Sequence, residues 1–312
     1  MTMPAEGISE RYSLYAVAAG VSQLGGITQQ SLKLGTEVRG EASSAEPYVR
    51  FQSVVAQKPS ASFTTRHITT ALGLCGPLGV SIGTLIGGLK LYAQKWVEGG
   101  TRASGSIHRS FTMLKGLLVP TTLSAQHRGD ATIGYNAHII YDGLNSPVVV
   151  SDVAALAAIS SDAERFALGP FGIEGVCSGQ LTDLSVNFGL NVETLGSESM
   201  VWDTFSGITS IQPSITLKGN RITWFGGSAI PLAGKAVTHA GSYFFLRKRA
   251  AGASFVADVT TQHLKVACAG LAHIDDAMTA SGTGAAECSI TIPLKFDGTN
   301  SPLVISTGVA IA

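Results

Sequence analysis

The sequence predicts a mainly β protein of two tandem homologous domains, each an antiparallel β-sandwich or β-barrel with little helix. Three observations lead to this fold class. Residues 179–312 repeat the pattern of residues 25–151, apolar and polar residues alternate along several segments, and glycine-containing turns separate these segments. Each repeat is long enough to bury its own core. We therefore expect an N-terminal arm at 1–24, a first β domain at 25–151, a linker at 152–178 and a second β domain at 179–312.

The repeat has a constant spacing. At least twelve residues of the second half are identical to the residue 154 positions earlier, and so many matches at one offset indicate a real repeat. They include Ser185, Gly189, Val192, Phe205, Pro213, Ser214, Ile222, Thr223, Gly227, Pro231, Leu232 and Gly241. Near the end of each half the offset becomes 155, because Asp-Gly-x-Asn-Ser-Pro occurs at 142–147 and again at 297–302. A single insertion explains the change.

The opening segment of each repeat alternates like a strand with one buried face. Its apolar positions are Leu32, Leu34 and Val38 in the first copy and Leu184, Val186, Phe188, Leu190 and Val192 in the second. The opposite positions hold Ser31, Lys33, Gly35 and Glu37, and in the second copy Ser185, Asn187, Gly189 and Asn191. Polar loops follow at 39–50 and 193–204 and lead to a second β-rich run, so each copy is expected to contain a long hairpin.

The segments after the hairpin differ more between the copies. Residues 63–74 favour a short helix, because Ile68 and Leu72 lie four positions apart. The matching region of the second copy contains the turn signal Gly219-Asn220, which makes a helix there less favourable. A further short helix is expected in the linker, around 161–168.

The last strand of each copy has the clearest alternation. The apolar positions are Ile133, Tyr135, Ala137, Ile139 and Tyr141 in the first copy and Cys288, Ile290, Ile292, Leu294 and Phe296 in the second. Residues between them are mostly polar, so one face is predicted to pack on the core. Asp-Gly pairs at 142 and 297 follow these strands and indicate tight turns.

Composition argues against several classes of protein. The 21 basic and 21 acidic residues cancel, which disfavours a protein that grips nucleic acid through a strongly basic surface. The 37 glycines and the 13 % of charged residues indicate a smooth, weakly charged surface, which suits self-association. The four cysteines lie far apart without a C-x-x-C motif, so neither a metal nor a cofactor is expected.

One segment imitates a membrane span. Residues 71–89 carry no charge, with glycines at four-residue spacing, but the matching segment of the second copy contains Lys235 and His239. We therefore expect no membrane insertion. The start of the chain lacks the pattern of a secretory signal, which favours reduced thiols in a cytoplasm.

Catalytic patterns are weak. Residues 79–83 match the G-x-S-x-G motif, yet that motif requires a strand–turn–helix on a parallel sheet, and Lys235 replaces Ser81 in the second copy. His273 with Asp275 and Asp276 lacks a second cluster of ligands. The run 247–249, Arg-Lys-Arg, is most simply a solvated face. We expect no enzymatic activity.

The duplicated β domain, the mid-strand glycines Gly35 and Gly189, the long polar hairpin and the Phe-Thr-Thr-x-x-Ile-Thr-x-x-Leu-x-Leu stretch at 63–74 resemble the tail tube, or major tail, proteins of long-tailed bacteriophages. More narrowly, the chain resembles siphophage tube proteins whose tube domain is doubled. The likeness covers nearly the whole repeat.

This resemblance implies a virion protein of the tail, assembled in the host cytoplasm. Homotrimeric rings of six pseudo-equivalent domains would stack into a tube, whose inner β-barrel surrounds a channel for non-specific passage of DNA. Its other partners would be the tape measure, terminator and tip proteins of the tail. By position, the channel wall would receive Lys33, Glu37, Asn187 and Asn191. Ring stacking would use the loop residues Arg39, Glu41, Glu46, Arg50, Glu193, Glu198 and Asp203.

Three alternatives stay open from the sequence. A ring-shaped DNA clamp also uses duplicated domains, although clamps present a basic inner face. A capsid or baseplate protein is a second structural alternative, although residues 1–24 contain a single arginine. A serine hydrolase that uses Ser81 is the least favoured.

Overall fold

The chain is described by a computed structural model. It covers residues 11–20, 22–42, 44, 47–96, 108–155, 165–197, 200–226, 229–250, 252, 255–280, 282 and 286–311. Strands hold 60 % of the residues and helices 5 %, and the sheets are antiparallel. The mainly β fold class predicted from the sequence is confirmed.

The first half of the molecule, residues 11–154, contributes twelve strands among the described residues. They are β1 (Arg11–Ala19), β2 (Ser22–Leu24), β3 (Ile27–Lys33), β4 (Thr36–Ala42), β5 (Val49–Gln57), β6 (Ser60–Thr65), β7 (Val80–Ser81), β8 (Leu89–Trp96), β9 (His108–Met113), β10 (Gly116–Gln126), β11 (Thr132–Ile139) and β12 (Val149–Ala154). The helix α1 (Ile68–Leu74) and the 3-10 turn η1 (Ile82–Thr84) lie between β6 and β8.

The second half, residues 166–309, has the same succession of strands, but among its described residues η1 has no counterpart. Its described strands are β13 (Phe166–Ile173), β14 (Cys177–Ser178), β15 (Leu181–Asn187), β16 (Leu190–Leu195), β17 (Phe205–Ile211), β18 (Ser214–Gly219), β19 (Lys235–Val237), β20 (Ser242–Lys248), β21 (His263–Cys268), β22 (Gly270–Thr279), β23 (Glu287–Pro293) and β24 (Leu303–Val309). The 3-10 turn η2 (Ile222–Trp224) takes the place of α1, as the Gly219-Asn220 turn signal indicates.

The two halves also share their sheet topology. One five-stranded sheet has the order β12-β9-β8-β1-β2, and its counterpart has the order β14-β13-β20-β21-β24, which is the same order read from the other end. Ten further strands form a single sheet, β19-β22-β23-β18-β15-β10-β11-β6-β3, with β7 paired to β10, and the other four form the two-stranded sheets β4-β5 and β16-β17. The halves are therefore topologically equivalent, whereas their origin by tandem duplication stays a prediction.

The core lies between each five-stranded sheet and its part of the ten-stranded sheet. In β11 the residues Ile133, Tyr135, Ala137 and Ile139 are buried, and in β23 so are Cys288, Ile290 and Ile292. The alternation predicted for these strands is confirmed. Phe296 is different, because it lies beyond the end of β23 and is 57 % exposed.

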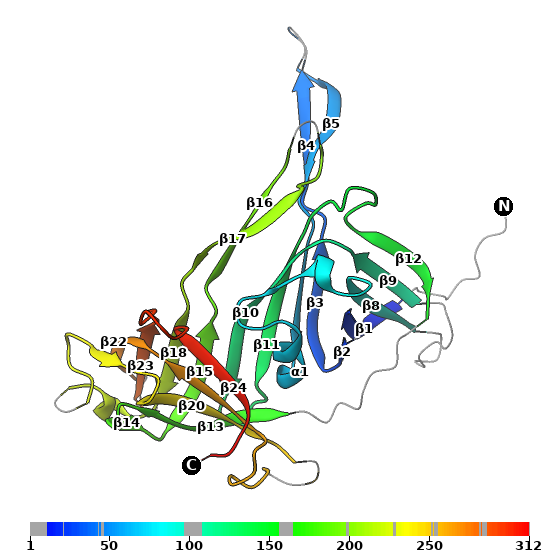
Figure 1. Cartoon of the computed structure of the whole chain (residues 1–312). Helices are drawn as coiled ribbons and strands as arrows, with labels where there is room; N and C mark the ends of the chain where they lie inside the picture. Colours follow the sequence, from blue (N-terminus) through cyan, green and yellow to red (C-terminus); the bar gives the residue numbers. More distant parts are fainter. Residues whose placement is uncertain are drawn as a thin grey trace.

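Each half projects a two-stranded hairpin from the ten-stranded sheet, β4–β5 and β16–β17 (Figure 1). The chain leaves the sheet at Gly35 and Gly189, whose φ angles are +57° and +61°. A Cβ atom there would overlap the carbonyl oxygen of Lys58 or Gln212 on the returning strand. Glycine is therefore required at both exits, both for the left-handed backbone and for the close approach.

The opening strand of each repeat is consequently two strands rather than one. Leu34 and Val38 were expected on a buried face, but they are 54 % and 57 % exposed because they lie at and beyond the exit. In the second half Leu184, Val186 and Phe188 are buried as predicted. The alternation continues across the glycine although the sheet ends there.

The expected domain boundaries also need correction. Residues 11–24 were assigned to an arm, but they form β1 and β2, and Val17, Ala19 and Leu24 are fully buried in the core. In the linker expected at 152–178, β13 and β14 belong to the second five-stranded sheet. Residues 166–168 of the expected linker helix begin β13, and residues 161–164 lie outside the described residues.

Residues 71–89 do not form a long helix. Helix α1 ends at Leu74, and the chain then forms β7, η1 and the start of β8. In the described part of the chain, no helix has both the length and the apolar character to cross a bilayer.

Candidate assembly surfaces

One face of the ten-stranded sheet is covered with small polar side chains. Hydroxyl pairs bridge neighbouring strands on it: Ser31 with Ser62 at 2.7 Å, Ser124 with Thr132 at 3.1 Å, and Thr216 with Thr291 at 3.4 Å. The charged side chains on this face include Lys33, Lys218, Asp183, Asp275, Asp276 and Glu287, so acidic side chains outnumber basic ones. The face is hydrophilic and carries few cations.

The four predicted channel residues separate into two groups. Lys33 and Asn187 end the strands β3 and β15 of this sheet, and Lys33 lines a shallow pocket of about 190 Å³ with Asn136 and His138. Glu37 and Asn191 instead lie in the hairpin strands β4 and β16, beyond the glycine exits. Their expected place on the same strand face as Lys33 and Asn187 is wrong, because the chain changes direction between them.

The predicted stacking residues lie mostly in strands rather than in loops. Arg39 and Glu41 are in β4 and form an exposed ion pair at 3.1 Å, Arg50 is in β5 and Glu193 is in β16. Asp203 is 8 % exposed, so it is unsuited to a contact with another ring. Glu46 and Glu198 lie outside the described residues.

The hairpin of the second half is docked on the first half. Its tip carries Trp202, whose indole Nε1–H donates to the side-chain oxygen of Gln57 at 2.8 Å. The Trp202 ring packs on Tyr141 with 5.2 Å between ring centroids. Two backbone hydrogen bonds of 2.8 Å flank it, from the N–H of Gln57 to the carbonyl of Val201 and from the N–H of Tyr141 to the carbonyl of Asp203. This contact explains why Asp203 is buried.

A groove lies beside the docked Trp202. The groove has a volume of about 510 Å³, and its wall includes Leu34, Gln57, Pro59, Pro147, Val148 and Trp202. The second half has its own groove of about 240 Å³, lined by Phe188, Ile211, Pro213, Phe296, Pro302 and Leu303 among others. Five of these six residues follow a lining residue of the first groove by 154 or 155 positions, and the sixth, Phe296, follows Tyr141, which packs on Trp202, by 155. The two grooves are therefore equivalent sites.

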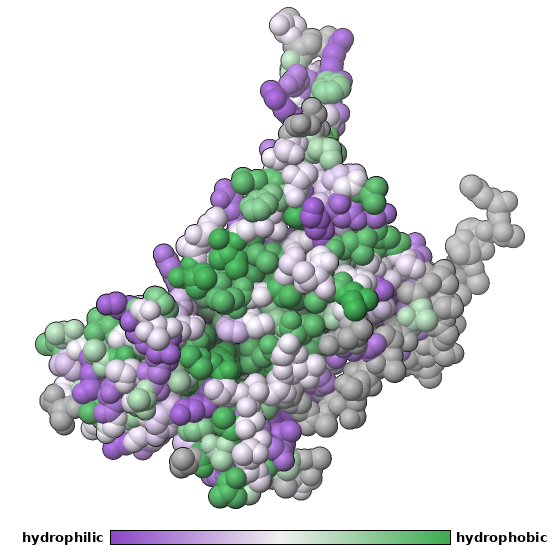
Figure 2. All heavy atoms as spheres, in the orientation of Figure 1, coloured by the Kyte–Doolittle hydropathy of each residue, from purple (hydrophilic) through white to green (hydrophobic). Residues whose placement is uncertain are grey.

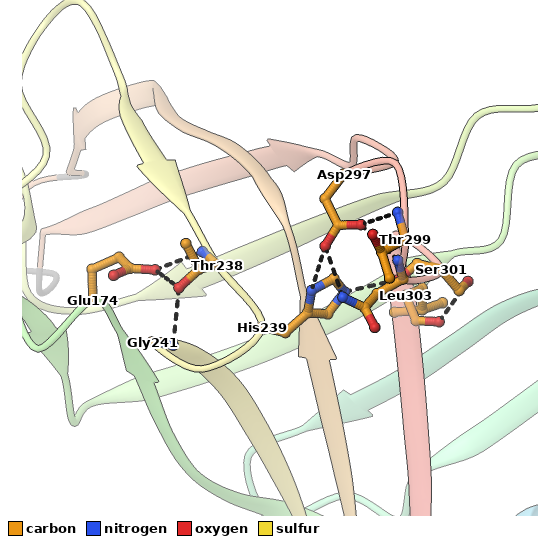
Figure 3. Close-up of polar contacts among 9 residues, drawn as sticks. Glu174, Thr238, His239, Gly241, Asp297, Thr299, Ser301 and Leu303 are labelled. Atoms are coloured by element: carbon orange, nitrogen blue, oxygen red, sulfur yellow. Dashed lines mark hydrogen bonds and ion pairs between the residues drawn. The ribbon is translucent and has the colours of Figure 1, made fainter.

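Polar contacts hold the wall of the second groove (Figure 3). The Asp297 carboxylate accepts hydrogen bonds from the backbone N–H of Thr299 and Asn300 at 2.8 and 2.6 Å, and from the Asn300 amide at 3.0 Å. These bonds, the Asn300 side chain first, lower the pKa of Asp297 to about 2. His239 lies 3.8 Å from the same carboxylate and 2.8 Å from the carbonyl of Ser301.

The loop that carries His239 is itself held by Glu174. The Glu174 carboxylate accepts hydrogen bonds from the backbone N–H and the hydroxyl of Thr238, at 2.6 and 2.9 Å (Figure 3). In the first half the counterpart of the Asp297 turn is closed by Asp142, which accepts the same three hydrogen bonds. Both grooves are thus bounded by a well-formed turn, and the second has additional support.

The ten-stranded sheet has two edges without a full partner among the described strands. At one end β3 pairs only with β6. At the other end β22 pairs along its length with β23, and β19 covers only Gly270–Ala272 on its second side. Unpaired strand edges of this kind are templates for association with another chain.

The junction between the halves is formed by strand pairing and by charge. Strand β10 pairs with β15 over Thr122–Gln126 and Asp183–Asn187. Asp130 of the first half lies within 3.5 Å of Arg165 and 3.3 Å of Arg249 of the second, and 3.9 Å from Arg66. The basic run at 247–249 therefore has structural partners, since Arg247 also pairs with Asp258 at 2.7 Å.

The candidate catalytic residues form no recognisable active site among the described residues. Ser81 lies in the two-residue strand β7, which pairs antiparallel to β10 and is followed by a three-residue 3-10 turn. This context differs from a nucleophile elbow. His108 and His263 take equivalent structural roles, because each Nδ1 accepts a backbone N–H bond of 3.1 Å, from Lys95 or Lys248.

No group of three or more metal-ligating side chains occurs in the described residues. All four cysteines are buried and free. Burial raises the pKa of Cys75 and of Cys268 to about 12, so these thiols are unreactive at neutral pH.

Sequence reasoning missed the residues of the docking contact. Trp202 was assigned no role, and Tyr141 and Phe296 were predicted only as apolar positions of the last strands, although the offset of 154 aligns Trp202 with another aromatic residue, Tyr48. That alignment was the available signal. Neither a protein-family model nor a curated protein matches this chain.

Proposed function

We propose that this chain is a structural protein of a phage tail, which assembles into stacked rings that form a hollow tube for the passage of DNA. One observation carries this proposal. A single sheet runs through both halves, and its two incompletely paired edge strands, β22 and β3, are the counterparts of β10 and β15, which pair at the internal junction. The protein would be located in the virion tail after assembly in the host cytoplasm.

The internal junction supplies the template for the contact between copies. Strand β22 is the counterpart of β10, and β3 is the counterpart of β15, so β22 of one copy would pair with β3 of the next. Ser124 pairs with Ser185 at the internal junction, and the equivalent pair is Thr279 with Ser31. Lys33 would then face the Asp276–Ala277 position, which brings opposite charges together.

Such a contact is heterologous, because the two surfaces differ. A heterologous contact closes into a ring when its rotation divides a full turn, and otherwise produces a helical filament. The resemblance to doubled tube proteins implies three copies, which would supply six equivalent positions. Closure would also remove both open strand edges.

The polar face of the sheet suits the wall of a DNA channel. Its hydroxyl groups and few basic side chains offer few cations to phosphate, and each cation that neutralises a phosphate adds salt-dependent affinity. DNA would pass without being held. A clamp that binds duplex DNA is favoured less, because its inner face would need an excess of lysine or arginine.

Negative-stain electron microscopy of the purified full-length chain across a concentration series tests the proposal. We expect six-lobed rings at low concentration and hollow striated tubes at high concentration. A chain that remains monomeric at every concentration, or that forms only solid filaments, contradicts the proposed function.

A further inference from the structure

We infer that Tyr48 at the tip of the β4–β5 hairpin docks into the groove of the second half of a neighbouring copy, where it packs on Phe296 and Ile211. This inference rests on the proposed self-assembly and specifies its contact. The occupant is a second copy of this chain, and the template is the docking of Trp202 inside one copy.

The residues on both sides of the contact are equivalent by position. Tyr48 precedes Trp202 by 154 residues, and both lie at the end of a hairpin before its second strand. Trp202 contacts Gln57 and Tyr141, whose counterparts are Ile211 and Phe296. Both counterparts line the groove of about 240 Å³ in the second half.

Both surfaces are exposed within one copy. Tyr48 is 77 % exposed, Phe296 57 % and Ile211 47 %. The hairpin that carries Tyr48 also exposes Val49 and Phe51, and the groove rim exposes Leu78. Figure 2 shows apolar side chains gathered on the body of the molecule, below the projecting hairpin. A concentration of large exposed apolar residues indicates a binding surface.

The contact must come from another copy. In the ten-stranded sheet, β3 lies at one end, whereas β22 lies at the other end beside the short strand β19. The β4–β5 hairpin starts directly after β3, whereas the groove is lined mainly by the half that contains β22, with Pro77 and Leu78 of the first half at its rim. Within one copy, the docked β16–β17 hairpin follows β15. It contacts the half that contains β10, the strand with which β15 pairs. The same neighbour would therefore receive both β3 and Tyr48.

The chemistry of the second site fits tyrosine. Gln57, which accepts the indole N–H, is replaced by apolar Ile211, and the stacking partner Tyr141 is replaced by Phe296. The site therefore offers an apolar wall to a ring whose hydroxyl can remain at the water-exposed rim. By analogy with the two flanking backbone bonds, the carbonyls of Pro47 and Val49 would accept from the N–H groups of Ile211 and Phe296.

The groove is preorganised for this contact. Phe296 immediately precedes Asp297, whose turn is closed by three hydrogen bonds, and His239 bonds the carbonyl of Ser301 in the same wall (Figure 3). A preformed wall reduces the ordering cost when the ring docks.

Cross-linking of paired cysteines tests the contact directly. The variant that carries both Tyr48→Cys and Phe296→Cys is treated with a short bis-maleimide during assembly, and the products are separated under denaturing conditions. The native cysteines are buried, so they should contribute little background. We expect covalent oligomers in the double variant and only monomers in each single variant.

Assembly of point variants gives the second readout. Tyr48→Ala should raise the protein concentration needed for rings and tubes at least about tenfold, because an anchoring aromatic ring is lost. Tyr48→Phe keeps the ring and should assemble like the unmodified chain. Since Tyr48 is exposed, circular dichroism should show both variants folded.

The outcomes separate this inference from the proposed function. If the unmodified chain forms tubes while Tyr48→Ala assembles normally and the double variant gives no covalent oligomers, the docking contact is wrong and the tube function stands. If the unmodified chain never forms rings or tubes, both fail.

Discussion

The two hairpins arise at equivalent points of the two halves, yet they have different surroundings. The β16–β17 hairpin lies against the first half through Trp202, whereas β4–β5 projects away from the molecule (Figure 1). The aromatic residue at the tip is half-buried in one hairpin and 77 % exposed in the other. The difference shows that equivalent sequence positions form a contact within the molecule where the same chain supplies the partner surface. Where the chain supplies none, the aromatic residue stays exposed.

The exits of the hairpins should be the most sensitive positions. Alanine at Gly189 requires a left-handed backbone and places a Cβ against the carbonyl of Gln212, so Gly189→Ala should lower the free energy of unfolding by about 3 kcal/mol. Gly35→Ala should act in the same direction, by about 2 kcal/mol, because its Cβ overlaps Lys58 less closely. Urea unfolding of dilute monomer measures both.

Gly143→Ala is the control for these glycines. Gly143 also has a positive φ, +101°, but a Cβ there meets no atom within 4 Å. Gly143→Ala should therefore lower the free energy of unfolding only through backbone strain, by about 1 kcal/mol. Equal losses for all three variants would contradict the argument from close approach.

The docked tip should contribute to stability and the free tip should not. Trp202→Ala removes a hydrogen bond to Gln57 and the ring contact with Tyr141, so it should destabilise the monomer by about 2–3 kcal/mol. Tyr48→Ala should change monomer stability by less than about 0.5 kcal/mol, as expected for an exposed side chain. Unfolding curves of the two variants, recorded at a concentration where the chain does not assemble, measure both changes in stability. Equal changes would contradict the proposed difference between the docked tip and the free tip.

Charge reversal at the open sheet edges tests the proposed pairing of β3 with β22 of the next copy. Lys33→Glu would place like charges opposite Asp276 of the next copy, and it should raise the concentration for assembly by about fivefold, which corresponds to about 1 kcal/mol. Asp276→Lys in the same chain should restore assembly. Sedimentation measures the assembled fraction, and the effect should shrink in high salt. Failure of the second change to rescue the first would reject this register.

The smallest expected effect concerns the turn at the second groove. The pKa of Asp297 is about 2, below its ordinary value, so its charge stabilises the folded state above pH 4 and this contribution is lost as the pH falls through about 2. Asp297→Asn should lower the thermal midpoint slightly at pH 7, relative to the parent chain, and this difference should be much smaller at pH 2. A difference that persists undiminished at pH 2 would assign the effect to hydrogen bonding rather than to charge.

The fold class was predictable because alternation and turn chemistry are local. The clearest case is β11, where residues 133–139 alternate without interruption and where burial follows the pattern. The end of β3 was not predictable in the same way. Leu34 and Val38 keep the alternation, but Gly35 turns the chain out of the sheet, and periodicity carries no information about direction.

The sequence did not predict where each half begins, for a different reason. At the offset of 154, only Arg11 and Leu14 among residues 11–19 are identical to their counterparts, Arg165 and Leu168, although both segments form equivalent strands of the two five-stranded sheets. A buried strand needs only apolar residues of suitable size, so its sequence can diverge. The docking site was partly accessible, since Tyr48 and Trp202 align, but the role of Phe296 depends on which strands become neighbours.

The pairing of β10 with β15 has a further consequence for assembly. Any ring of these chains contains twice as many half-to-half junctions as copies, and one junction per copy, the internal one, is already formed when the chain folds. Only the remaining half requires the translational and rotational entropy of free molecules to be lost. Joining two halves in one polypeptide gives the internal junction a high effective concentration, so fewer independent encounters complete a ring.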